Sequence, residues 1–180
     1  MFRNDGNYEF FLRQYDKYLS PVADTYAYCL LGNHFHILLR VRESSFIFNS
    51  KRADIALRDT HELVSHQFRK FFQSYSMAYN KQHQRLGTLF QTPFKRVLIE
   101  SDNYFTNLIY YVHANPQSHG LTNDFRTWKW SSYNSILSDK PSRLNKNEVI
   151  SWFGSKGDFE KFHREYRQLV LDEKLIIEDF

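Results

Sequence analysis

The chain has 180 residues and a formal charge of +4, which suits one globular domain with a modest hydrophobic core. It has one cysteine, Cys29, which excludes an intramolecular disulfide bond, and no apolar run approaches the roughly 18 residues that a membrane-spanning helix needs. The first residues lack the basic-then-apolar order of a signal peptide, so we expect a cytoplasmic protein.

Apolar spacing and turn signals predict the elements of the first half of the chain. In order, they are a helix over 7–19, strands over 25–31 and 34–41, a loop over 44–60 and a long amphipathic helix over 61–82. The turn signal Gly32-Asn33 stands between the two apolar runs of the strands, and so short a connection indicates a β-hairpin.

The second half of the chain is less regular. In order, we expect a strand over 94–100, a helix from a cap at Ser101 or Asp102 to about Ala114, an aromatic segment over 128–133, a polar loop over 138–147 and a last helix around 158–171. Pro116 should end the first of these helices, because the residue before a proline is pushed out of the helical region. The order of elements favours an α+β sandwich with helices on one face of an antiparallel sheet.

Lysines and arginines gather in the middle third of the chain, with phenylalanines and tyrosines interleaved among them. The basic positions are Lys51, Arg52, Arg58, Arg69, Lys70, Lys81, Arg85, Lys95 and Arg96. Basic groups can neutralise phosphates while aromatic faces stack on unpaired bases, which is typical of a nucleic-acid binder. The pattern fits a solvated helix face over ordinary core aromatics equally well, and both interpretations stay open here.

His34 and His36 lie two residues apart at the start of the second predicted strand. Side chains alternate across a strand, so the two imidazoles share a face, roughly 6–7 Å apart at the backbone, and can converge on one ion, while Phe35 points into a core. Imidazole pairs suit zinc, manganese and other transition ions, so the motif alone does not name the metal. Taken alone, the motif fits two satisfied polar residues at a strand start better.

Tyr111 and Asn115 lie four residues apart at the end of a predicted helix, hence on one face of it. A tyrosine hydroxyl has a pKa of about 10 and is a poor nucleophile unless a neighbouring cation assists it. The amide oxygen of Asn115 could serve as a third metal ligand. Taken alone, these residues fit a core tyrosine and a helix-ending Asn-Pro pair better.

Four blocks, in this order, resemble the single-tyrosine transposases of the HUH type, especially the REP-associated tyrosine transposases. The blocks are AYCLLGNHFHILL (27–39), GTLFQTPFKR (87–96), YYVHANP (110–116) followed by Gly120-Leu121, and WKWSSY (128–133). The resemblance spans about residues 7–167, and four ordered blocks are far more specific than any one of them.

The resemblance implies an α+β, ferredoxin-like βαββαβ sandwich, an antiparallel sheet with helices on one face. We expect it over residues 1–135, with 136–180 as a C-terminal helical extension, a loop and helix packed on the same domain. The family's first strand is apparently absent, because only residues 1–6 precede the first helix. That strand is central, so its loss would leave two interior edges unpaired. Another segment fills the gap, the start is misassigned, or the gene has decayed.

The resemblance also implies the roles of the site residues. His34 and His36 would bind a divalent metal, Mg²⁺ or Mn²⁺, and Asn115 stands where relatives supply a third, polar ligand. Tyr111 matches the family's nucleophile, and Tyr110 ranks second because it faces about 100° around the helix. The expected DNA contacts are Gln91, Lys95, Arg96 and Arg85.

The implied reaction is attack on a phosphodiester of single-stranded or hairpin DNA, which leaves a 5′-phosphotyrosine link and a free 3′-hydroxyl without a nucleotide cofactor. Such an enzyme would associate with the nucleoid, touch no membrane, and act as a monomer or a homodimer. Two alternatives remain. A decayed or domesticated relative would bind single-stranded DNA without cutting it, and a metal-dependent hydrolase would use the histidines to activate water.

Overall fold

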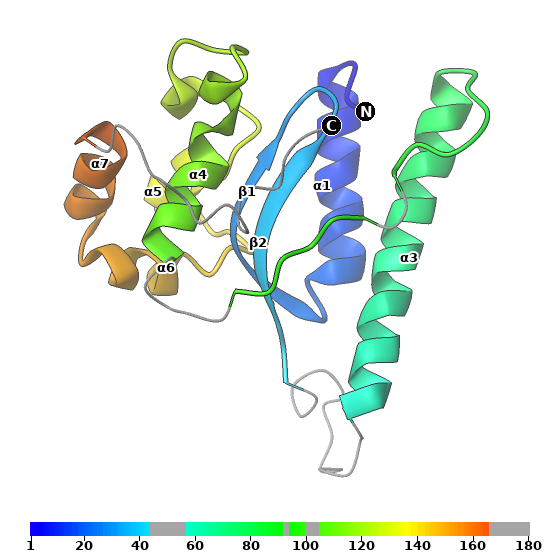
Figure 1. Cartoon of the computed structure of the whole chain (residues 1–180), viewed down its shortest axis with the longest axis horizontal. Coiled ribbons are helices and arrows are strands. Elements are labelled where there is room, and N and C mark those ends of the chain that lie inside the picture. Colours follow the sequence, from blue (N-terminus) through cyan, green and yellow to red (C-terminus); the bar gives the residue numbers. More distant parts are fainter. Residues whose placement is uncertain (44–56, 92–93, 100–104, 166–180) are drawn as a thin grey trace. The chain divides into compact units, whose positions relative to one another are not determined.

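The computed structural model describes residues 1–43, 57–91, 94–99 and 105–165 (Figure 1). The elements are α1 (Asp5–Leu19), β1 (Ala23–Leu30), β2 (Phe35–Val41), α3 (Leu57–Gln82), α4 (Phe105–Ser118), η2 (Phe125–Thr127), α5 (Tyr133–Leu137), α6 (Lys146–Phe153) and α7 (Lys156–Glu165). The fold is α+β, with a two-stranded antiparallel sheet among the described residues, and the ferredoxin-like arrangement stays a prediction. None of the described helices is long and apolar enough to cross a membrane.

The chain forms two compact units. The first comprises Met1–Asp24 and Leu39–Thr92, and the second comprises Thr25–Leu38 and Pro93–Phe180. The domain boundary predicted at residue 135 stays a prediction.

In the first unit, the predicted helices over 7–19 and 61–82 are confirmed as α1 and α3, with longer N-terminal ends. The side chain of Asn4 caps α1 by accepting a hydrogen bond of 3.1 Å from the backbone nitrogen of Asn7, which starts the helix at Asp5. Helix α3 begins at Leu57, inside the range predicted as a loop, and the rest of that loop lies outside the described residues.

Aromatic side chains make the core between α1 and α3, which lie side by side in Figure 1. The ring of Phe11 contacts Phe71 at 4.9 Å and Tyr75 at 5.1 Å, both edge to face, and all three are buried. The Tyr75 hydroxyl also donates to the carbonyl of Met1 at 3.0 Å, which ties down the start of the chain. Much of the high aromatic content therefore serves packing.

The predicted hairpin is confirmed as β1 and β2, but β2 begins at Phe35, so His34 lies just before the strand. The aromatic segment predicted over 128–133 borders the outer edge of β1. There the backbone nitrogen of Leu30 donates to Trp130 and that of Ser132 donates to Tyr28, each at 2.9 Å. These bonds occupy backbone groups of β1 that an open edge would leave to water.

The prediction of a strand over 94–100 is wrong for the residues that the structure describes. Residues 94–99 are irregular and mostly exposed, and residue 100 lies outside the described part. An apolar run becomes a strand only where a neighbour offers a ladder of hydrogen bonds. The described sheet has two strands, and neither pairs with this run.

Helix α4 is longer than predicted, because it passes through Pro116 and ends at Ser118. A proline removes the hydrogen bond that its own nitrogen would donate to residue 112, but it leaves the later bonds intact. The backbone nitrogens of His119 and Leu121 donate to Asn115 and Pro116 at 2.9 and 2.8 Å, which completes the last turn. The predicted cap at Ser101 or Asp102 lies outside the described residues.

The second unit carries short helices that the sequence did not predict. Helix α5 begins at the end of the predicted aromatic segment and α6 begins at the end of the predicted polar loop, and both continue into residues for which no element was predicted. Helix α7 coincides with the described part of the predicted last helix. Their apolar faces pack with β1 and α4 in one core, which includes Tyr26, Ala27, Cys29, Leu31, Ile109, Val112, Phe125, Tyr133, Ile136, Val149 and Phe159.

Two buried imidazoles link α4 to α7 and to the segment beside β1. His113 Nδ1 lies 3.0 Å from His163 Nε2, and His113 Nε2 lies 2.7 Å from the hydroxyl of Ser132. His163 Nδ1 faces the carbonyl of Phe159 at 2.8 Å, and the hydroxyl of Ser132 accepts from the backbone nitrogen of Tyr28 at 2.9 Å. The carbonyl of Phe159 can only accept, so His163 Nδ1 donates to it. With both rings neutral, this fixes the donor and the acceptor in every other hydrogen bond of the run.

His163→Gln should flatten the dependence of stability on pH. Burial lowers the pKa of His163 from 6.5 to about 4, so the folded chain favours the neutral ring. The stability contributed by this ring is complete above the unfolded pKa and is lost as the pH falls through the interval between these two values. In urea unfolding, the free energy of the unaltered chain should fall by about 1.4 kcal/mol more than that of the variant between about pH 7.5 and about pH 5.5.

The exposed His66 of α3 provides a matched control, and His66→Gln should keep the pH dependence of the unaltered chain. Equal pH slopes for the unaltered chain and His163→Gln would contradict the neutral, buried imidazole pair.

Candidate functional site

The two histidines of the hairpin lie together in the second unit. Their ring centroids are 5.1 Å apart with the planes nearly perpendicular, and His36 is buried while His34 is half-buried. The turn before them is closed by the backbone nitrogen of Leu31, which donates to the carbonyl of His34 at 2.9 Å. The predicted same-face placement of the two rings is therefore confirmed.

Asn33 orients the His34 ring. Its amide oxygen lies 2.8 Å from His34 Nδ1, so this nitrogen donates and the neutral ring keeps a lone pair on Nε2. The Nε2 atoms of His34 and His36 are both buried. An imidazole nitrogen that keeps a lone pair is suited to bind a metal ion.

Helix α4 brings its own polar face to these rings. Tyr111 and Asn115 lie four residues apart on it, and the ring of Tyr111 is 5.5 Å from that of His36, again edge to face. Asn115 is buried, and its amide nitrogen donates to the carbonyl of Tyr111 at 2.7 Å. The amide oxygen of Asn115 is then the atom left to act as a ligand.

The structure separates the two adjacent tyrosines. Tyr110 packs against core rings, with centroids 5.9 Å from Phe125, 6.3 Å from Phe162 and 5.7 Å from His163. Tyr111 also packs against the core, but its ring lies beside His36. Of the two tyrosines, Tyr111 is the one beside the histidine pair, as its place in the motif predicted.

The donor set limits what the site can hold. Within the described ranges, no three His, Cys, Asp or Glu side chains are grouped so that they could hold an ion. A metal bound here would take two imidazoles and, as its third protein donor, the amide of Asn115. Two nitrogens and one oxygen fit manganese and related transition ions well, and magnesium less well because it prefers oxygen ligands.

The residues predicted to contact DNA differ in their hydrogen bonds and in their exposure. In the first unit, the guanidinium of Arg85 braces its own loop by donating to the side chain of Asn80 at 3.3 Å and to the carbonyl of Thr88 at 3.4 Å, and Gln91 is exposed. In the second unit, Lys95 and Arg96 are exposed. Their role in binding stays a prediction.

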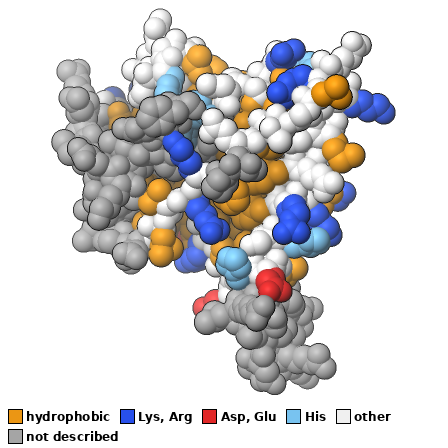
Figure 2. Space-filling view, turned by 45° about the vertical axis from the view of Figure 1, so that its right-hand side comes forward, with side chains coloured by type: hydrophobic (Ala, Val, Ile, Leu, Met, Phe, Trp, Pro, Cys, Tyr) orange, Lys and Arg blue, Asp and Glu red, His pale blue; other side chains and the backbone are white. Residues whose placement is uncertain are grey.

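The aromatic residues interleaved with basic ones on α3 are mostly structural. Phe71, Tyr75 and Tyr79 are buried, so they are unavailable for stacking on bases. Figure 2 shows lysine and arginine side chains scattered over the face that it draws, with hydrophobic side chains between them. For these three aromatics, the interpretation as ordinary core residues is the correct one.

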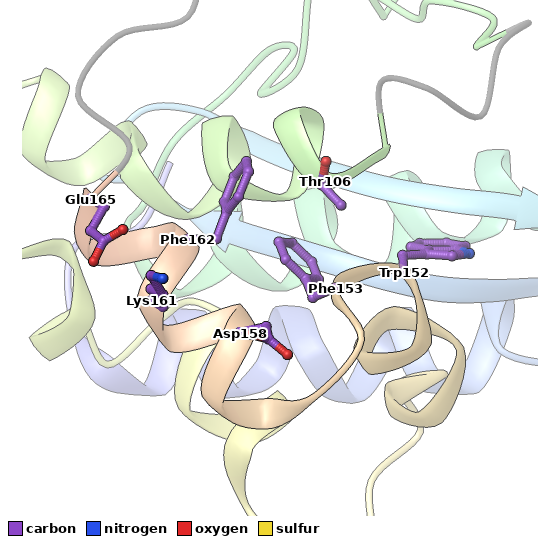
Figure 3. A pocket seen from close by; sticks show the side chains of 7 residues that line it. All are labelled: Thr106, Trp152, Phe153, Asp158, Lys161, Phe162 and Glu165. Atoms are coloured by element: carbon purple, nitrogen blue, oxygen red, sulfur yellow. The ribbon is translucent and has the colours of Figure 1, made fainter.

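A pocket of about 450 Å³ lies elsewhere in the second unit (Figure 3). Its lining comes from the start of α4, from α6 and from α7, and comprises Thr106, Trp152, Phe153, Asp158, Lys161, Phe162 and Glu165. None of the predicted site residues lines it, so it does not bear on the predicted chemistry.

The sequence interpretation missed His119, which the structure places at the site. Its ring centroid is 5.1 Å from that of His34. The signal was its spacing, since His119 follows Tyr111 and Asn115 at successive intervals of four residues. The buried His113 was also missed as a structural residue, because nothing in the sequence pairs it with His163.

The chain is similar to a protein of Haemophilus influenzae whose name is "Putative REP-associated tyrosine transposase", with 28% identity over 112 residues. The similarity covers 61% of this chain and 58% of that relative, so the chain matches little more than half of the relative's length. No family model matches the chain, and no solved structure is significantly similar to it. The similarity confirms the resemblance to tyrosine transposases that the four sequence blocks predict.

Tyr111→Phe should leave the fold intact. The ring and its contact with His36 remain, and at most one hydroxyl hydrogen bond is lost, which is worth about 0.5–1.5 kcal/mol. Urea unfolding should stay cooperative, with a loss no larger than that range. Tyr75→Phe, which loses its bond to Met1, is a comparison of the same chemical size. A loss of about 3 kcal/mol or more for Tyr111→Phe would show that this hydroxyl is structural.

Proposed function

Because the chain resembles the REP-associated tyrosine transposases, we propose that it cleaves and rejoins single-stranded DNA through a 5′-phosphotyrosine intermediate at Tyr111, with a divalent metal. The observation that carries this proposal is the contact of 5.5 Å between the rings of Tyr111 and His36, beside two buried imidazole nitrogens.

In the proposed cleavage, the phenol oxygen of Tyr111 forms a bond to the phosphorus of a DNA phosphodiester. The bond from phosphorus to the 3′ oxygen breaks, the leaving oxygen takes up a proton, and the proton of the phenol passes to water. The phosphotyrosine ester conserves the energy of the broken bond, so a 3′-hydroxyl can attack it and rejoin the strand without a nucleotide cofactor.

The residues that would hold the ion, Mg²⁺ or Mn²⁺, are His34, His36 and Asn115. When bound, the ion supplies positive charge that polarises the phosphate and favours the phenolate of a group whose free pKa is about 10. Asn33 fixes the tautomer of His34 through its bond of 2.8 Å, and the intrahelical bond of Asn115 orients its amide.

The proposed substrate is single-stranded or hairpin DNA. Lys95 and Arg96 are exposed on an irregular segment of the second unit and can neutralise phosphates, and Gln91 and Arg85 are the further contacts proposed from the first unit. The cytoplasmic location and the choice between monomer and dimer stay predictions.

A second candidate is a relative that binds single-stranded DNA without cutting it. The observation that favours it is that the sheet of the described residues has two strands and that residues 94–99 are irregular. A two-stranded hairpin by itself is marginally stable at best in water. Formation of a covalent adduct separates the two candidates, and metal-dependent cleavage without an adduct would indicate a hydrolase instead.

Tyr111→Phe should abolish adduct formation while single-strand binding persists, because the nucleophile is lost and the ring is kept. The measurement is incubation of the full chain with labelled single-stranded DNA that carries its flanking genomic repeats, with Mn²⁺ or Mg²⁺, followed by a denaturing gel. Tyr110→Phe is the matched control and should keep most of the adduct, since Tyr110 packs in the core. An adduct at the normal rate with Tyr111→Phe would place the nucleophile elsewhere.

Single-strand binding should weaken steeply with salt. If Arg85, Lys95 and Arg96 each neutralise one phosphate, affinity should fall roughly 20-fold between about 50 and about 200 mM salt, and Lys95→Ala should reduce the logarithmic slope by about 0.7. The exposed Lys17 of α1 gives the control variant Lys17→Ala, with an unchanged slope. Fluorescence anisotropy measures both quantities. An affinity that does not depend on salt, or a preference for plain duplex DNA, would contradict the proposed phosphate contacts.

A further inference from the structure

His119 extends the polar face of α4 by one turn. It follows Ser118, the last residue of the helix, and its backbone nitrogen donates to the carbonyl of Asn115 at 2.9 Å. The side chain is exposed, unlike those of Asn115 and His36. Tyr111, Asn115 and His119 therefore follow one another along one side of the helix, each a turn from the next.

The ring of His119 contacts His34 at the same separation at which His34 contacts His36. Both centroid distances are 5.1 Å, and both pairs meet edge to face. Imidazole nitrogens bind zinc-like ions at about 2.1 Å, which puts each ring centre about 3.2 Å from the ion and two such centres roughly 4.5–5.5 Å apart. Each of the two pairs has the separation of rings that share an ion.

A small movement is required. In the conformation described, the three histidines are not grouped as a metal centre. The side chain of His119 is exposed at the end of a helix, and exposed side chains change rotamer within nanoseconds. The ring can therefore turn about its side-chain bonds towards an ion on His34 and His36 while the helix stays in place.

A third imidazole would change which ion the site prefers. Magnesium takes oxygen ligands and keeps much of its water, whereas manganese, cobalt and zinc accept imidazole nitrogens readily. Replacing a water on the ion with an imidazole therefore raises the affinity of the site for the transition ions and changes its affinity for magnesium little.

We propose that His119 turns onto the ion held by His34 and His36 and makes the site select Mn²⁺ over Mg²⁺. This inference rests on the proposed metal site, and it assigns to His119 a role as a ligand beside Asn115.

The test is direct metal binding by the full chain without DNA. Free Mn²⁺ is followed by electron paramagnetic resonance during a titration, and Mg²⁺ affinity is obtained by competition against Mn²⁺. His119→Ala should weaken Mn²⁺ binding at least about tenfold and change Mg²⁺ binding less than about twofold, in keeping with the loss of one nitrogen ligand. His34→Ala should remove the binding of both ions.

The exposed His66 of α3 gives the matched control variant His66→Ala, which should bind both ions as the unaltered chain does. His119→Ala that binds Mn²⁺ with unchanged affinity, while His34→Ala does not bind it, would overturn the role of His119 and leave the proposed function standing. An unaltered chain that binds neither ion, or His34→Ala that binds both normally, would overturn the proposed metal site and this inference together.

Discussion

A run of hydrogen bonds through two buried imidazoles sets the orientation of α4, and the candidate site depends on that orientation. The run passes from the carbonyl of Phe159 through His163 and His113 to Ser132, and from there to the backbone of Tyr28 in β1. Residues two apart on a helix point about 200° away from each other. Once His113 is drawn into the core, Tyr111 must face the opposite side, where His36 lies.

The same constraint explains why the adjacent residues Tyr110 and Tyr111 have different neighbours. Tyr110 lies about 60° around the helix from the direction of His113, counted over three residues, and it packs on His163 and Phe125. Tyr111 remains half-buried, and it lies next to the imidazole of His36, whose Nε2 atom is buried. The grouping of two imidazoles with a phenol is the reason to regard this corner as functional.

Much of this site could be predicted from the sequence, because its residues belong to local patterns. The spacing of two residues at the start of β2 brings His34 and His36 together, and the repeat of a helix brings Tyr111 and Asn115 together. The same helix repeat extends to His119, but a single histidine beyond a proline gave no reason to continue the helix. Its approach to His34 depends on tertiary packing.

Elements that depend on distant partners were harder to predict. Residues 94–99 have the composition of a strand, but whether they form one is decided by a neighbouring backbone and not by their own side chains. The hydrogen bond between His113 and His163 joins residues that are 50 positions apart in the sequence, and no periodic pattern predicts it. Helix α6 begins in the predicted polar loop, and its apolar residues, such as Val149, gain order by packing in the core.

In the proposed reaction, the hydroxyl oxygen of Tyr111 becomes covalently bound to DNA at this site. The most direct measurement is mass spectrometry of the proteolysed chain after reaction with a single-stranded oligonucleotide and Mn²⁺, which locates the residue that carries the nucleotide phosphate. We expect the modification on Tyr111. A modification on Tyr110 or on another residue, or no modification under conditions in which the strand is cut, would contradict it.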